Sequence, residues 1–196
     1  MTVSKQITRP TPYASPEDFR QVFDEHMNSL YLLAFLLTAD QEKAEQCVVS
    51  GLEDAVEGSP VFKEWAHSWA RRAVILNAVR VLSPRPADGN DRGQSSSDAA
   101  DSNDRTLSDG ARAEIAAILE LKPFERFAYV ITVLERYSDK ECSVLLGCTR
   151  RDVLAARVRA LKEVGGAMET RYQQLPSASP RNPALRERIS SALQFY

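Results

Sequence analysis

The sequence contains few of the residues that build covalent cross-links or metal sites. Its 196 residues include three cysteines, at positions 47, 142 and 148, and two histidines, His26 and His67. No two cysteines have the CxxC spacing, and neither histidine belongs to an HExxH motif. A disulfide framework and a structural zinc site both need paired spacing. We therefore expect buried thiols in a reducing compartment and no bound metal.

Long apolar stretches are also scarce. The longest unbroken apolar run, Leu30–Leu37, has eight residues, whereas a helix that crosses a bilayer needs about twenty. The first ten residues contain no apolar segment of the kind found in secretory signals. These absences predict a protein without a membrane span, with the cytoplasm as its location.

Motifs that carry catalysis are missing as well. The sequence has no P-loop glycines and no nucleophile elbow. Carboxylates are plentiful, but none forms a recognisable pair in an apolar setting. We therefore predict that the protein is not an enzyme and that it needs no cofactor.

Helical patterning dominates what is present, and strand patterns are nearly absent. Ser15-Pro16 and Asp40 have the form of helix starts, and Pro123 stands at the first position of another helix. Apolar residues then recur at helical spacing. Helices are expected at about residues 16–37, 41–57, 60–82, 111–121, 123–134, 139–146 and 149–165, with a short last one at 183–195 that carries Leu185, Ile189 and Leu193.

The composition changes sharply in the middle of the chain. Residues 83–110 are rich in Ser, Asp, Gly and Pro, and Leu107 is their only large apolar side chain. Such a segment cannot bury enough surface to offset the entropy of ordering it. The sequence therefore predicts an all-α protein of two small helical domains, 15–82 and 111–170, with a flexible linker at 83–110 and a tail at 171–196.

Residues 139–159 combine several features of a DNA-binding helix-turn-helix. A short helix is opened by the capping box Ser138–Glu141, Gly147 allows a tight turn, and Thr149 caps the following helix. Although the net charge of the whole chain is −2, this second helix is locally basic. The expected DNA contacts on it are Thr149, Arg150, Arg151, Leu154, Arg157, Arg159 and Lys162.

The roles of these residues follow from their positions on the helix. Arg150 and Arg151 would reach into the major groove from the first turn, and the helix N-terminus would rest on a phosphate. Arg157 and Arg159 lie further along and would contact backbone phosphates. The alternative interpretation is a plain helical hairpin with a solvated basic face.

The stretch LKPFERFAYVITVLERYSDKECSVLLGCTRRDVLAARVRALKEV, residues 121–164, resembles region 4 of sigma-70-type initiation factors of the extracytoplasmic-function (ECF) group. The resemblance rests on Pro123, Arg126, Glu135, Ser138, Glu141, Leu145, Leu146, Gly147, Val153, Arg157 and Arg159-Ala160. The sequence departs from the pattern at Arg136, which stands for a glycine, at Cys142, which stands for an isoleucine, and at Ser143, which stands for an alanine. The resemblance implies a helix-turn-helix that reads an upstream promoter element.

The first half of the chain resembles region 2 of the same family. Residues 30–38 are similar to its first conserved helix, residues 44–52 to its clamp-docking helix, and residues 62–71 to the helix that reads the downstream element. The resemblance assigns polymerase binding to Glu45, Gln46, Val49 and Leu52, and DNA binding to Arg71 and Arg72. The sequence departs from the family at Gln46, Val49, Arg72 and Leu76.

Two tryptophans one turn apart, Trp65 and Trp69, admit two interpretations. They could pack in the core of a small helical domain, or they could stack on unpaired bases. Arg71, Arg72 and Arg80 lie on the same helix, and for all three a solvated face is as open an interpretation as DNA contact.

The resemblance implies a sigma factor that directs core RNA polymerase to a subset of promoters. Core RNA polymerase and promoter DNA are then the expected partners, and an anti-sigma factor is a further candidate. Two alternatives stay open: a sigma-like DNA-binding regulator that no longer opens promoters, and a degenerate sigma factor that acts only as a protein-interaction module.

Overall fold

A computed structural model of the chain describes residues 12–58, 60–86 and 109–174. All regular secondary structure in these residues is helical, and among them the only β-type pairing is an isolated bridge between Tyr13 and Phe62. The predicted all-α fold class is therefore confirmed. None of the helices in the described ranges has the length and hydropathy needed to cross a bilayer.

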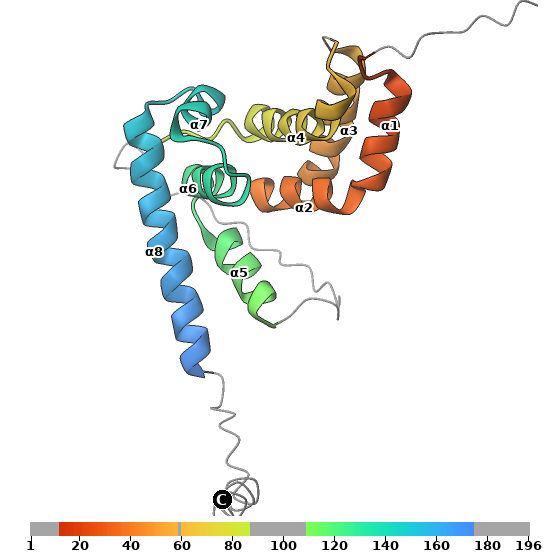
Figure 1. Cartoon of the computed structure of the whole chain (residues 1–196). Coiled ribbons are helices and arrows are strands. Elements are labelled where there is room, and N and C mark those ends of the chain that lie inside the picture. Colours follow the sequence, from red (N-terminus) through yellow and green to blue (C-terminus); the bar gives the residue numbers. More distant parts are fainter. Residues whose placement is uncertain (1–11, 59, 87–108, 175–196) are drawn as a thin grey trace, which may run out of the picture.

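The first half of the chain forms four packed helices (Figure 1). They are α1 (Pro16–Glu25), α2 (Met27–Thr38), α3 (Gln41–Glu57) and α4 (Ala66–Leu82). Ser15 caps α1 with a complete capping box, and Asp40 caps α3 through the backbone N–H of Lys43, at 3.0 Å. The predicted single helix over 16–37 is wrong, because the chain bends at His26, which ends α1 and precedes α2.

The segment before α4 also differs from the prediction. A helix was expected from Pro60, but residues 60–62 are not helical and a 3₁₀ turn, η1 (Lys63–Trp65), comes before α4. The reason is a long-range contact: the N–H of Ala14 donates to the carbonyl of Val61 at 2.7 Å, and the rings of Tyr13 and Phe62 stack. This contact holds the chain extended where the local pattern alone favours a helix.

The second half contains α5 (Asp109–Glu120), α6 (Pro123–Tyr129), a π-helical turn η2 (Val130–Leu134), α7 (Asp139–Leu146) and α8 (Arg150–Gln174). Two predicted boundaries change. Asp109 and Gly110 belong to α5 and not to the linker, and α8 runs to Gln174 instead of ending near residue 165. Beyond that point α8 still has an apolar underside, since Ala167 and Met168 pack against the core.

Two other predicted segments fall largely outside the described residues. They are the flexible linker, of which only its first residues and its last two are described, and the last helix at 183–195. The division into two domains stays a prediction. What the structure adds is that one buried apolar cluster includes residues of both halves, from Phe19 and Leu37 to Phe127 and Val164.

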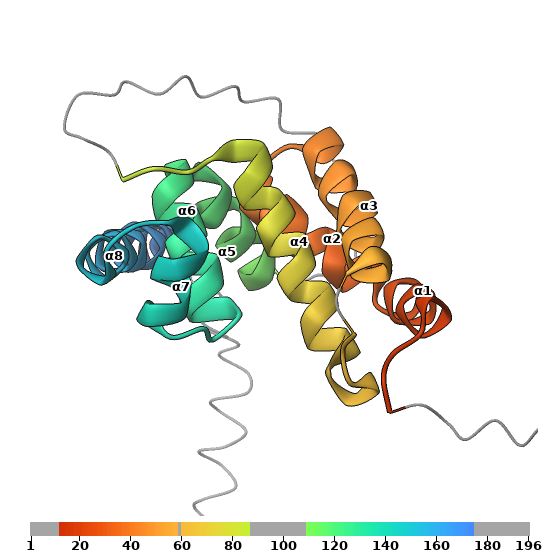
Figure 2. The ribbon, with the colours of Figure 1, turned by 90° about the horizontal axis from the view of Figure 1, so that it is seen from above.

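The two halves meet along α2 and α4 (Figures 1 and 2). Helix α2 packs on α5, α6 and η2, and α4 packs on α7. Arg126 of α6 is buried at this junction and donates to the carbonyls of Leu37 and Thr38 at the end of α2, at 3.1 and 3.3 Å. One guanidinium group thus joins the two halves through the end of a helix.

A charged pair closes the same junction from α4. The Nε of Arg71 donates to Glu135 Oε2 at 2.7 Å, and its second nitrogen bonds the other carboxylate oxygen. Beside it, burial raises the pKa of Tyr137, and the neighbouring Arg72 guanidinium partly offsets this rise. The junction is therefore polar at its rim and apolar within.

We expect Arg71 and Glu135 to be energetically coupled. In a double-mutant cycle with Arg71→Met and Glu135→Gln, the coupling energy should be about 1–2 kcal/mol, because the pair is bidentate and mostly covered. Urea unfolding of the four proteins measures it. The exposed pair Arg20–Glu17 serves as the control, with a coupling near zero. Additive effects of the two substitutions at Arg71 and Glu135 would mean that the pair does not form in solution.

Candidate nucleic-acid interface

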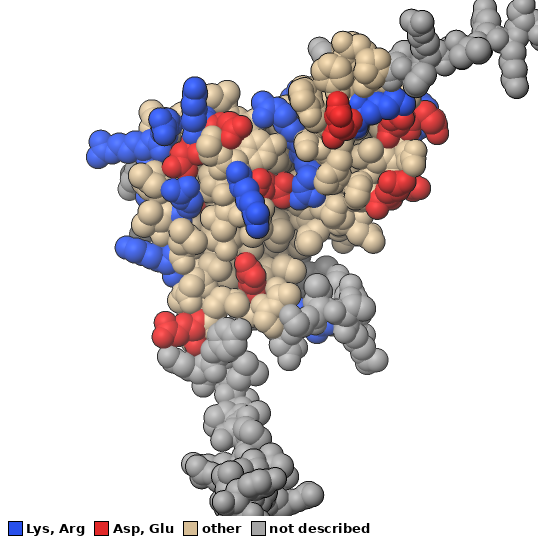
Figure 3. Space-filling view, viewed as in Figure 1, with Lys and Arg blue, Asp and Glu red and all other residues tan. Residues whose placement is uncertain are grey.

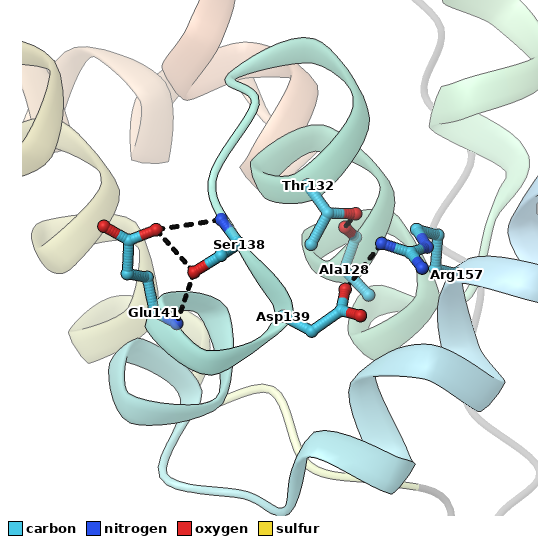
Figure 4. Close-up of polar contacts among 6 residues, drawn as sticks. All are labelled: Ala128, Thr132, Ser138, Asp139, Glu141 and Arg157. Atoms are coloured by element: carbon cyan, nitrogen blue, oxygen red, sulfur yellow. Dashed lines mark hydrogen bonds and ion pairs between the residues drawn. The ribbon is translucent and has the colours of Figure 1, made fainter.

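The start of α7 is fixed by a reciprocal pair of hydrogen bonds (Figure 4). The hydroxyl of Ser138 accepts from the backbone N–H of Glu141 at 3.2 Å, and the Glu141 carboxylate accepts from the N–H of Ser138 at 2.9 Å. These bonds hold the pKa of Glu141 below its usual value. The capping box predicted from the sequence is confirmed.

The connection between α7 and α8 is a three-residue turn. Gly147 has φ 63°, the left-handed conformation that glycine adopts without steric cost. The next residue, Cys148, donates its N–H to the carbonyl of Ser143 at 3.0 Å. Thr149 then opens α8: its hydroxyl accepts from the N–H of Asp152 at 3.2 Å, and the Asp152 carboxylate accepts from the N–H of Thr149 at 3.1 Å.

The packing of α8 decides which side chains face outward. Val153, Ala156 and Ala160 are buried against the rest of the second half. The opposite side is open, and Lys and Arg side chains gather over the upper part of α8 next to α7 (Figure 3). The exposed predicted contacts there are Thr149, Arg150, Arg151, Leu154, Arg159 and Lys162.

Two of the predicted phosphate contacts have partners inside the protein. Arg157 donates to Asp139 at 2.5 Å and so ties α8 to the start of α7 (Figure 4). Arg159 donates through Nε to Glu125 at 2.6 Å. Glu125 is buried, and its second carboxylate oxygen has no partner. Both arginines therefore hold the fold of the second half, although the guanidinium of Arg159 stays half exposed.

The predicted DNA contacts on α4 lie at the junction of the two halves. Arg71 is bound to Glu135, and Arg72 lies beside Tyr137. Both side chains are partly buried. No local pattern in the sequence indicates these neighbours, because they lie more than sixty positions away along the chain.

The tryptophans of the same region are more open than core packing allows. Trp65 is 60% exposed and Trp69 is 36% exposed. Trp69 lines a shallow cavity of about 300 Å³ together with Arg72, Arg80, Asp54 and Glu57. The core interpretation of Trp65 is wrong. The carboxylates of this cavity were not among the expected site residues, and no local signal in the sequence marks them.

The predicted polymerase-binding residues lie on α3. Glu45, Gln46 and Val49 are exposed, and Val49 is open to 58%. Leu52 is half-buried and packs against the core. Three of the four residues therefore share an accessible surface.

Within the described ranges, no three histidine, cysteine or acidic side chains come together as a metal site would require. No protein-family model matches the chain, and no curated protein matches it either.

Arg136 stands where the resemblance has a glycine, and it adopts φ 58°. A side chain costs about 1–2 kcal/mol in this conformation, so Arg136→Gly should raise the free energy of unfolding by up to about 1 kcal/mol after the entropy of glycine is counted. Thermal unfolding measures the change. Arg20→Gly in the middle of α1 is the control and should lower stability by about the same amount. A loss of stability at both positions would contradict the left-handed conformation of Arg136.

Proposed function

We propose that the chain is a sigma factor of the ECF type, which directs core RNA polymerase to specific promoters and reads promoter DNA with α7 and α8. The observation that carries this proposal is the geometry around Gly147: a capped short helix, a left-handed turn, and a second helix whose first turn presents Arg150 and Arg151 to solvent. The resemblance of residues 121–164 to sigma region 4 agrees with it.

The first turn of α8 is suited to a nucleic-acid partner. Its unpaired backbone N–H groups and the positive end of the helix dipole favour a phosphate. Arg150 and Arg151 flank this point, and arginine forks match the acceptor edge of guanine in the major groove. Lys162 is exposed further along the same helix and would add a phosphate contact.

The first half supplies two further surfaces for this function. The exposed side of α3, with Glu45, Gln46 and Val49, would dock on the polymerase. Trp65 and Trp69 are accessible for stacking on unpaired bases. A factor held on the polymerase in this way needs little DNA affinity of its own, which is consistent with the net charge of −2.

One observation favours a second candidate function. Arg71 and Arg72, which the resemblance assigns to the downstream promoter element, lie at the junction of the two halves, where Arg71 is bound to Glu135. A chain that keeps this junction closed would act as a sigma-like DNA-binding regulator without opening promoters. The remaining alternative is a module that binds only a partner protein. Such a module would contact DNA with neither α8 nor α4.

The deciding experiment measures polymerase binding and transcription with the same purified chain. Sites bound in the cell are mapped by cross-linking, and core polymerase plus the chain is then tested for run-off transcripts from those sites. A sigma factor binds polymerase and yields transcripts, and a regulator binds the DNA without them. Val49→Asp should abolish polymerase binding, whereas Met27→Asp, at an exposed residue of α2, should not. Absence of polymerase binding by the wild-type chain would overturn the proposal.

A further inference from the structure

The outward side of α8 carries an apolar stripe that nothing in the described part of the chain covers. Leu154, Val158 and Leu161 are exposed to 46%, 43% and 46%. Their spacing, i, i+4 and i+7, places them on one face of the helix. The other large aliphatic side chains of α8, Val153 and Val164, are buried in the core. The stripe is therefore additional to the face that packs α8 against the protein.

DNA recognition does not explain the whole stripe. Leu154 lies close to the first turn and could contact a thymine methyl group. Leu161 lies about 10 Å further along the helix axis, and an aliphatic side chain gains nothing from a phosphate. Covering these aliphatic side chains would remove apolar surface from water, so an apolar partner for this face would bind favourably.

The chain itself contains a segment with a matching pattern. After α8 ends at Gln174, the sequence continues through residues 175–182 to Pro183, and Leu185, Ile189 and Leu193 then recur at helical spacing. Asn182-Pro183 is a typical helix start. Such a helix would carry one apolar side, which must pack on another apolar surface to be stable.

The lengths allow this segment to fold back on α8. From Gln174 to Leu161 the helix rises about 20 Å, and two packed helices lie about 8–10 Å apart. Eight extended residues span up to about 26 Å, so residues 175–182 can bridge this distance. Leu185 to Leu193 covers about 12 Å along a helix, which matches the length of the stripe.

We infer that residues 183–196 form an amphipathic helix that lies antiparallel to α8, with Ile189 against Val158 and Leu185 near Leu161. The short connection gives the segment an effective concentration near the millimolar range, so a contact of modest strength is occupied. In this position the helix covers Leu154 and stands beside Arg150 and Arg151. The docking does not depend on the proposed function, whereas its consequence, competition with promoter DNA, rests on it.

Disulfide trapping tests the contact and its direction in the full-length chain. With Cys148→Ser as background, Val158→Cys is combined with Ile189→Cys, and Leu161→Cys with Leu185→Cys. Oxidised glutathione is the oxidant, and non-reducing gels follow the reaction. We expect both pairs to form an intramolecular cross-link at least about ten times faster than the matched control, Glu163→Cys with Ile189→Cys, whose α8 position lies on another side of the helix.

Two controls separate this arrangement from others. Leu154→Cys with Leu185→Cys should stay reduced, because it requires a parallel helix. Circular dichroism of each reduced variant, compared with wild type, verifies folding, and the two stripe pairs test the contact independently of each other. Equal rates for all pairs, or a cross-link between two copies, would overturn the inference. Since no DNA or polymerase is present, this outcome is distinct from a failure of the proposed function.

Discussion

Replacing Arg126 by methionine is expected to lower the free energy of unfolding by about 3 kcal/mol or more. The side chain is buried and donates to four backbone carbonyls, of Leu37, Thr38, Leu119 and Leu121, at 3.1–3.3 Å. Three of these carbonyls belong to the ends of α2 and α5, and Leu121 directly follows α5; helices leave acceptors unsatisfied there and carry partial negative charge. Methionine would leave them buried without donors.

The charge of Arg126 is tolerated because of these acceptors. Burial lowers its pKa to about 10, so the guanidinium remains protonated at neutral pH. In the described part of the chain, the hydrogen-bond partners of this guanidinium are the four backbone carbonyls and include no carboxylate.

Urea unfolding monitored by circular dichroism measures the effect of Arg126→Met. Arg20→Met, at an exposed residue of α1, is the control and should change stability by less than about 0.5 kcal/mol. Arg126→Lys should recover only part of the loss, since lysine has fewer donors and no fork. A loss below about 1 kcal/mol for Arg126→Met would show that water reaches the four carbonyls.

The double variant Arg150→Ala, Arg151→Ala is expected to weaken promoter binding at least thirtyfold, or about 2 kcal/mol, at a fixed salt concentration. Each arginine that contacts a base contributes about 1–3 kcal/mol, and both side chains are exposed in the first turn of α8. Stability should hardly change, because neither residue has a partner in the core.

Fluorescence anisotropy with a labelled promoter fragment measures this loss. Arg157→Ala is the matched control on the same helix: its partner is Asp139, so it should reduce stability and change DNA affinity by less than about threefold. Unchanged affinity in the Arg150, Arg151 variant would mean that α8 is not the recognition helix.

The local parts of the fold could be predicted from the sequence because short-range chemistry determines them. The caps at Ser15, Asp40 and Ser138 and the left-handed turn at Gly147 each depend on a few neighbouring residues. The bounds of α3 and α7 follow from these signals and match the prediction.

The remaining features depend on contacts between distant residues. The bridge and the ring stacking between Tyr13 and Phe62 keep the backbone at Phe62 extended. Helix α4 therefore begins later in the chain than the local pattern predicts. Glu135 forms an ion pair with Arg71, and Asp139 forms one with Arg157. A pattern of basic residues in the sequence cannot distinguish such paired arginines from an exposed basic surface. Trp65 is exposed because the described fold leaves most of its side chain uncovered, and no local sequence pattern indicates this.

The shared apolar cluster couples the stability of one half of the molecule to that of the other. Because Arg126 of α6 bonds the end of α2 and the apolar cluster includes residues of both halves, neither half can lose its structure without exposing apolar surface of the other. Any molecule that binds only the native form of one half therefore also stabilises the other half, by mass action. Occupancy of α8 should thus slow proteolysis of α1 and α2, far from the point of contact.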